Sequence, residues 1–138
     1  MTVTRPYSGL IARLRTAKLR PTRQRLALAR LLFDGPDRHV TAEGLHGEAR
    51  AEGVRVSLAT VYNTLHQFTA AGLLREVVAE PGKSHFDTNV SDHHHFYHQE
   101  TGQLTDIPGA AITVSALPRP PRGTDIARVD VVVRLSDR

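Results

Sequence analysis

The sequence predicts an α+β protein with a mainly helical N-terminal part and a smaller, strand-rich C-terminal part. Apolar residues follow helical spacing through the first 72 residues, and short stretches that are β-branched or alternating follow from residue 73 onward. The order of helices followed by a hairpin predicts a winged helix-turn-helix domain over residues 1–90. The remaining residues, 91–138, predict a small α/β domain.

Four helices are expected in the first part. The stretches YSGLIARLRTA and PTRQRLALARLLF carry apolar stripes, and the second opens with a Pro-Thr start signal and is stopped by DGP at 34–36. A third helix is expected between Thr41, an N-cap, and Gly53. The fourth follows a short turn, begins after Ser57 and ends at Gly72, which puts it in the position of a recognition helix.

The strands come after this point. LLREVVAE and SHFDTNV are separated by PGK, which predicts a β-hairpin. HHHFYH and GQLTDI predict two further strands, PGAAITVSALP a short helix, and the alternating stretch IARVDVVVRL (126–135) a third strand. A sheet of three such strands has too little core to stand alone, so we expect a dimer through residues 93–138.

Composition excludes several classes of protein and site. No apolar run approaches 18 residues and the N-terminus lacks the pattern of a secretory signal, so a cytoplasmic protein is expected. The chain has no cysteine, which excludes disulfides, thiolate-bound metals and cysteine nucleophiles. Any bound metal must therefore be held by nitrogen and oxygen.

Positive charge is concentrated in the first part of the chain. Residues 1–80 hold 12 Lys/Arg and 7 Asp/Glu, whereas residues 81–138 hold 6 and 7. Six basic residues and no acid lie between positions 13 and 25. This distribution favours a nucleic-acid partner, although a run of like charge is also typical of a solvated helix face, and charge alone leaves both open.

Two stretches offer groups suited to DNA. The helix start SLATVYNT presents small and hydrogen-bonding side chains for the major groove, and LRPTRQR presents basic groups for phosphate or the minor groove. The alternatives are a surface aromatic packed on its neighbours for the tyrosine and a solvated loop arginine for the first basic residue. The candidate DNA contacts are Arg20, Thr22, Arg23, Ser57, Thr60, Tyr62 and Asn63.

The segment DHHHFYHQETGQLTD holds four of the eight histidines. His93 and His95 are two apart on an expected strand, so their side chains point to one side. Two imidazoles with a carboxylate suit Fe²⁺, Mn²⁺ or Zn²⁺ and do not suit a Ca²⁺ site. Haem is a competing ligand because histidine is a common axial ligand. Taken singly, each histidine is more often a surface or hydrogen-bonding residue.

The motifs LRPTRQR, RHVTAEGLH, SLATVYNTLHQFTAAGL, GKSHFDT and HHHFYH, in this order, resemble the Fur family of metal-responsive transcription regulators over about residues 10–135. Within that family the chain is most similar to the iron response regulator (Irr) subgroup. The resemblance implies a homodimer that binds an AT-rich, near-palindromic DNA operator and controls genes of iron and haem metabolism. It also implies one divalent metal (Fe, Mn or Zn) per subunit, held between the two domains by His39, Asp87, His93, His95 and Asp106.

The resemblance also implies other sites, and here the chain departs from the family. Many relatives hold a structural zinc with two CxxC pairs, and the first pair falls here on His98 and Thr101, so no cysteine-bound zinc is expected. A second family metal site uses the position of His94, and the acid it requires falls on Thr113, which makes a complete second site doubtful. Haem sensing in the subgroup makes His93, His94 and His95 haem candidates and a haem-delivering protein a candidate partner.

Three alternatives remain beside this reading. One is a sensor of zinc, manganese or peroxide with the same fold. Another is a small metal hydrolase built on the same ligands, but the sequence has no HExxH, no nucleophile motif and no nucleotide-binding loop, so we do not expect an enzyme. The last is a haem-binding or docking module without a DNA role, and the basic N-terminal part argues against it.

Overall fold

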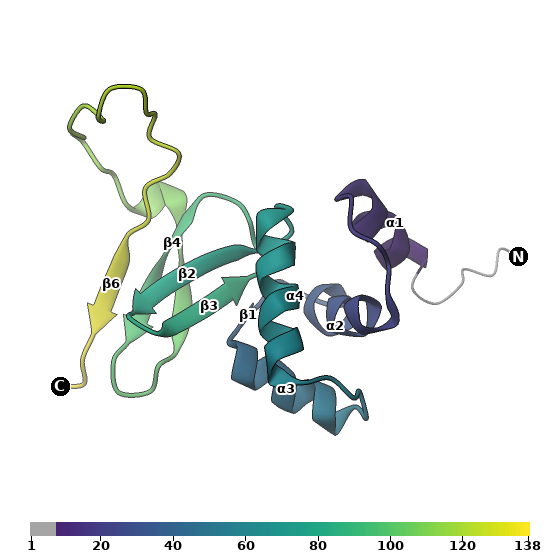
Figure 1. The fold of residues 1–138 in the computed structure, drawn as a ribbon. Helices are drawn as coiled ribbons and strands as arrows, with labels where there is room; N and C mark the ends of the chain where they lie inside the picture. Colours follow the sequence, from purple (N-terminus) through teal and green to yellow (C-terminus); the bar gives the residue numbers. More distant parts are fainter. Residues whose placement is uncertain (1–7) are drawn as a thin grey trace, which may run out of the picture. The chain divides into compact units, whose positions relative to one another are not determined.

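The computed structural model describes residues 8–138, so the first seven residues of the predicted 1–90 domain lie outside it. The described chain divides into two compact units with the boundary between Val90 and Ser91. Helices and sheets are both present, which confirms the predicted α+β class (Figure 1). In chain order the elements are α1 (Ser8–Thr16), α2 (Arg23–Phe33), β1 (His39–Val40), α3 (Ala42–Ala51), α4 (Leu58–Ala70), β2 (Arg75–Glu80), β3 (Lys83–Asp87), β4 (His93–His98), β5 (Leu104–Pro108), η1 (Gly109–Ala111) and β6 (Val132–Leu135).

Side-chain caps set the starts of the three main helices of the first unit. Thr22, Thr41 and Ser57 have extended backbones, and each side-chain oxygen accepts a hydrogen bond from the backbone N–H three residues on, at 3.2, 3.1 and 3.1 Å. These bonds satisfy donors that the first helical turn leaves without partners, at about 1 kcal/mol each. The predicted N-caps Thr41 and Ser57 are therefore confirmed, as is the Pro-Thr start of α2.

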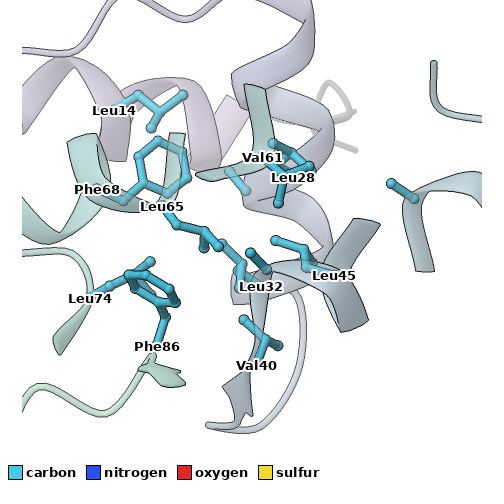
Figure 2. Packing of buried hydrophobic residues seen from close by; sticks show 13 residues of the cluster. Leu14, Leu28, Leu32, Val40, Leu45, Val61, Leu65, Phe68, Leu74 and Phe86 are labelled. Carbon is cyan, nitrogen blue, oxygen red and sulfur yellow. The ribbon is translucent and has the colours of Figure 1, made fainter. Parts of the chain in front are cut away.

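The apolar stripes of these helices meet in one core. Leu32 of α2, Leu45 of α3 and Leu65 of α4 point toward one another (Figure 2), and Phe68 and Phe86 join them from α4 and β3. All five side chains have 1% or less of their surface exposed. Burying a Leu or Phe side chain contributes about 1.5–3 kcal/mol, so this core fixes the position of α4 against α2 and α3.

The predicted hairpin is present as β2 and β3, which are antiparallel and joined through Gly82 in the left-handed region at φ 75°. The two-residue strand β1 pairs with β3 and was not predicted. Strands of this length carry no periodic signal. The pairing places His39 opposite Asp87 in the register of the sheet.

The second unit contains a sheet in the order β5-β4-β6, with β4 antiparallel to β5 and parallel to β6 (Figure 1). The three-stranded sheet is confirmed, but the strand predicted over 126–135 occupies only Val132–Leu135. The register that pairs His95 with Val132 explains the shorter length, because residues 126–129 then lie beyond the start of β4 at His93. At Val131, the backbone N–H donates to Nδ1 of His94 at 3.1 Å. The predicted helix after β5 is a single 3-10 turn, η1.

None of the helices within residues 8–138 has the length and apolar character needed to span a bilayer.

Candidate metal centre and nucleic-acid interface

Three predicted metal ligands converge in the second unit. His93 and His95 lie on one face of β4, and His95 is paired with Asp106 of β5 in the sheet register. The Nε2 atoms of His93 and His95 lie 3.3 and 3.4 Å from the same oxygen, Oδ1 of Asp106. The two imidazole rings are 4.5 Å apart between centroids. Two nitrogen donors and one carboxylate oxygen thus face a common point.

The orientation of His93 favours a cation at this point. Its Nδ1 lies 2.7 Å from the backbone carbonyl oxygen of Ser91, so we assign the ring proton of the neutral imidazole to Nδ1. That assignment leaves the Nε2 lone pair facing the carboxylate of Asp106. A lone pair and an anion repel each other unless a proton or a cation lies between them. A ring nitrogen held by a backbone carbonyl is also the usual arrangement behind a metal-bound histidine. The donor set therefore fits Fe²⁺, Mn²⁺ or Zn²⁺.

The other two predicted ligands form a pair in the first unit. His39 Nε2 lies 3.7 Å from Oδ2 of Asp87, its cross-strand neighbour. Oδ1 of Asp87 accepts the backbone N–H of Asn89 at 2.8 Å, which leaves Oδ2 directed at the imidazole. The five predicted ligands therefore lie in two groups, three in the second unit and two in the first.

His94 lies on the other face of β4 from His93 and His95, as strand alternation requires. It lines an open cavity of about 500 Å³ together with Ile112, Ala127 and Val129. Its Nδ1 is engaged by Val131 N–H at 3.1 Å. The assignment of haem to His93, His94 and His95 stays a prediction.

The predicted DNA contacts of α4 divide into two kinds. The Ser57 hydroxyl donates to Thr60 Oγ1 at 2.9 Å and accepts the Thr60 backbone N–H, so both residues take part in the cap. Asn63 is exposed, and Tyr62 is half-buried with its ring stacked near His66 at 6.4 Å between centroids. The packing alternative for Tyr62 therefore describes part of its surroundings, and the DNA contact stays a prediction.

The Tyr62 hydroxyl has a partner that sequence reasoning missed. It donates a hydrogen bond of 2.6 Å to Oε1 of Glu43 in the first turn of α3. This hydrogen bond raises the pKa of Tyr62 and lowers the pKa of Glu43 from their ordinary values. An acid in a first helical turn ordinarily serves the helix dipole, which is why Glu43 gave no separate signal.

The start of α2 is held by Arg25, one of the basic residues of LRPTRQR, through two hydrogen bonds that were not predicted. Its guanidinium donates from Nη1 to the backbone carbonyl of Arg20 at 2.9 Å and from Nη2 to Oε1 of Gln67 on α4 at 3.0 Å. This link fixes the LRPTRQR stretch beside the helix that carries Tyr62. The side chains of Arg20 and Arg23 are exposed. Thr22 serves as the N-cap, and its predicted DNA contact stays a prediction.

The chain is similar to known proteins in both sequence and structure. Residues 16–132 match the Ferric uptake regulator family, and the match extends over both units. Among curated proteins, the peroxide-responsive repressor PerR of Staphylococcus aureus is 33% identical over 97 residues, which are 70% of this chain and 65% of the relative. The alignment thus spans slightly less than two thirds of the length of that relative.

Solved structures show the same fold. The ferric uptake regulator of Pseudomonas aeruginosa, solved with manganese, superposes with a TM-score of 0.70 at 27% identity and covers 92% of this chain and 96% of its own. The ferric uptake regulator of Vibrio cholerae superposes with a TM-score of 0.73 at 22% identity over 93% of this chain and 99% of its own. The second likeness supports the fold alone.

Proposed function

We propose that this chain, which belongs to the ferric uptake regulator family, is a DNA-binding transcription regulator whose operator affinity depends on a divalent metal. The observation that carries the proposal is the convergence of His93 and His95 on one oxygen of Asp106, at 3.3 and 3.4 Å. A nitrogen and oxygen set of this kind accepts Fe²⁺, Mn²⁺ or Zn²⁺, and the chain offers no thiolate that would select a softer site.

We infer that one metal per subunit takes His93, His95 and Asp106 from the second unit and His39 and Asp87 from the first. The metal supplies a positive centre that neutralises the carboxylates and holds the imidazoles as neutral ligands. The chain itself supplies the orientation, because Ser91 holds His93 and the β1–β3 pairing presents His39 to Asp87. Ligands drawn from both units are the means by which metal binding favours one arrangement of the protein over others.

The DNA interface that we propose is formed by α4 and the start of α2. The basic side chains of Arg20 and Arg23 contact phosphate, which supplies affinity without sequence preference. Asn63 and Tyr62 reach base edges or thymine methyl groups from the N-terminal half of α4. The operator is near-palindromic, since a symmetric dimer places two copies of α4 on two half-sites. That it is also AT-rich is what the resemblance to the family implies.

The proposed active form is a homodimer through residues 93–138. A sheet of three strands has one face to cover, and the large apolar side chains of Val114, Leu117, Ile126 and Leu135 are exposed in this unit. The family is one of regulators, and we propose that this chain likewise has no catalytic role and acts in the cytoplasm.

The finer proposal is that the regulated genes serve iron and haem metabolism, as in the Irr subgroup, with haem as an additional signal at His93, His94 and His95 and a haem-delivering protein as a partner. The alternative in the same fold is a sensor of zinc, manganese or peroxide. The 33% identity to a peroxide-responsive repressor favours the peroxide signal among these.

A selection experiment separates these signals. Duplexes that bind the chain are selected from a random pool in parallel with Fe²⁺, Mn²⁺, Zn²⁺, haem or no addition, and the Fe²⁺ arm is repeated after exposure to peroxide. The proposal predicts enrichment of AT-rich, near-palindromic sites in at least one metal arm and loss of binding with haem. Loss after peroxide without any effect of haem identifies the peroxide sensor. Failure to enrich any duplex in every arm contradicts DNA binding.

A further inference from the structure

A second group of metal-binding side chains lies in the second unit, away from the ligands described above. His98 is the last residue of β4, Glu100 lies in the turn that follows, and Asp137 lies two residues beyond β6. The parallel pairing of β4 with β6 puts His98 level with Leu135 and thereby carries Asp137 to the same end of the sheet. Each of the three residues offers one ligand atom, and these atoms lie within 4.8 Å of one another.

The contacts within the group are specific. His98 Nε2 lies 2.7 Å from Oδ1 of Asp137 and 3.8 Å from Oε2 of Glu100. The imidazole is the least exposed member, with 23% of its side-chain surface accessible, while the carboxylates are open to solvent. Both carboxylates thus lie near one ring nitrogen of His98, and the group is open to solvent on the side of the carboxylates.

The opposite nitrogen of the ring is held by Thr101. His98 Nδ1 lies 2.8 Å from Thr101 Oγ1 and accepts the backbone N–H of Thr101 at 3.2 Å. Oγ1 of Thr101 also accepts the backbone N–H of Gln103 at 3.2 Å, which fixes the hydroxyl in the turn. When a cation takes the Nε2 lone pair, the ring proton moves to Nδ1, where Thr101 Oγ1 accepts it, and the backbone N–H of Thr101 loses its bond to that nitrogen. No net proton is released from a neutral ring.

We propose that His98, Glu100 and Asp137 form a second divalent-metal site, of one nitrogen and two oxygen donors, with Zn²⁺, Mn²⁺ or Fe²⁺ as its ligand. One imidazole with two carboxylates matches the preferences of these cations, and three protein ligands leave positions for water. The donor set contains no cysteine, unlike the structural zinc site held by two CxxC pairs in many relatives. It also shares no residue with the group formed by His93, His95 and Asp106. Its effect is to tie the segment after β6 to the end of β4.

The test uses Zn²⁺ and the full chain stripped of metal. Equilibrium dialysis measures the number of Zn²⁺ ions bound per chain and their dissociation constants for the wild type, Asp137→Asn and Glu100→Gln. Asp125→Asn, which changes another exposed carboxylate of the same unit, is the matched control. We expect two ions in the wild type and the control. Asp137→Asn and Glu100→Gln should each weaken one of them by about tenfold or more, since even the loss of an outer partner of a ligand costs that much.

A second measurement separates a metal site from an ordinary ion pair. Zn²⁺ raises the melting temperature of a protein that binds it only when folded. The rise caused by Zn²⁺ should be smaller in Asp137→Asn than in Asp125→Asn. A double variant, His93→Ala with His95→Ala, should still bind one ion, which keeps this inference distinct from the proposed function. Equal stoichiometry, affinity and thermal shift in Asp137→Asn, Glu100→Gln and the control would overturn it.

Discussion

The Tyr62 hydroxyl donates a 2.6 Å hydrogen bond to Glu43, and this bond joins the first turn of α3 to the exposed side of α4. The residue that we propose for the DNA surface therefore carries an acid at its tip. A carboxylate at a surface that contacts phosphate is unfavourable, so we expect Glu43 to oppose DNA binding while it holds Tyr62 in place. We therefore expect the pair to lower operator affinity below what the basic side chains alone would give.

Replacing Glu43 by Gln should strengthen binding to an operator duplex. The amide keeps an oxygen that accepts the Tyr62 hydrogen bond and removes the negative charge. We expect an improvement of about fivefold in Kd, because a unit charge about 4 Å from another contributes about 1 kcal/mol in water. Fluorescence anisotropy with a labelled duplex measures it. Glu52→Gln, at the other end of α3, is the control, and an equal gain in that variant would show a general charge effect instead.

The same substitution should change the titration of the phenol. The hydrogen bond to Glu43 raises the pKa of Tyr62, so the stabilisation is present at pH values below the ordinary tyrosine pKa and is lost as the pH rises through the raised value. At the acidic end, Glu43 has a lowered pKa, and its contribution is lost as the pH falls through that value. Ultraviolet titration should show one tyrosine of Glu43→Gln ionising at lower pH than in the wild type, and Tyr62→Phe should lack that component.

Replacing Tyr62 by Ala should weaken operator binding by about tenfold and leave the oligomeric state unchanged. We propose that the ring contacts base edges and methyl groups, and each good base contact contributes about 1–3 kcal/mol. Size-exclusion chromatography reports the oligomer and anisotropy reports the affinity. Tyr62→Phe should retain part of the affinity through the ring. If Tyr62→Ala bound the operator as tightly as the wild type does, the proposal that α4 contacts DNA would be contradicted.

Replacing His93 and His95 by Ala should abolish the dependence of DNA binding on metal. Both Nε2 atoms face Asp106, so the double variant leaves a single carboxylate from this unit. His94→Ala is the matched control because its ring lies on the opposite face of β4. Mn²⁺ binding followed by electron paramagnetic resonance should keep the wild-type stoichiometry in His94→Ala and fall by one ion per chain in the double variant. The reverse result would place the metal on the other face of the strand.

The role of Thr22 can be separated into cap and DNA contact. Thr22→Ala removes the acceptor for the Arg25 backbone N–H and should lower the free energy of unfolding by about 1 kcal/mol, while Thr22→Ser should restore it. Urea denaturation measures both variants. If Thr22→Ser also restores operator affinity, the hydroxyl is sufficient both for the cap and for any contact with DNA. A stable Thr22→Ser that binds DNA much more weakly than the wild type would assign the methyl group to the DNA surface.

Local signals in the sequence were sufficient for most of the fold. Thr41 and Ser57 begin helices because a capping oxygen acts on residues three positions away, and such pairs are visible along the chain. The strand β1 was not predicted because two residues are too few to show an alternation of apolar and polar side chains. The strand predicted from 126 is shortened to Val132–Leu135 because its parallel partner β4 begins only at His93, and the register of the pair leaves residues 126–129 beyond that start.

The site shows the same division between local and distant contacts. The spacing of His93 and His95 places them on one face, and strand alternation alone accounts for that. Their shared partner Asp106 was predicted only from the resemblance to the family. In the structure, Asp106 reaches them because the register of β4 with β5 pairs it with His95. Glu43 and Asp137 lie 19 and 39 residues from the groups that they contact. No local pattern predicts pairs at such separations.

The central claim is that metal controls operator affinity, and one ratio tests it most directly. The Kd for a selected operator duplex is measured by anisotropy for wild-type protein stripped of metal and for the same protein loaded with Fe²⁺, Mn²⁺ or Zn²⁺, at one salt concentration. The account predicts that at least one metal changes the Kd by about tenfold or more, corresponding to a coupling free energy of about 1.4 kcal/mol. Equal Kd values in every metal and in its absence would contradict it.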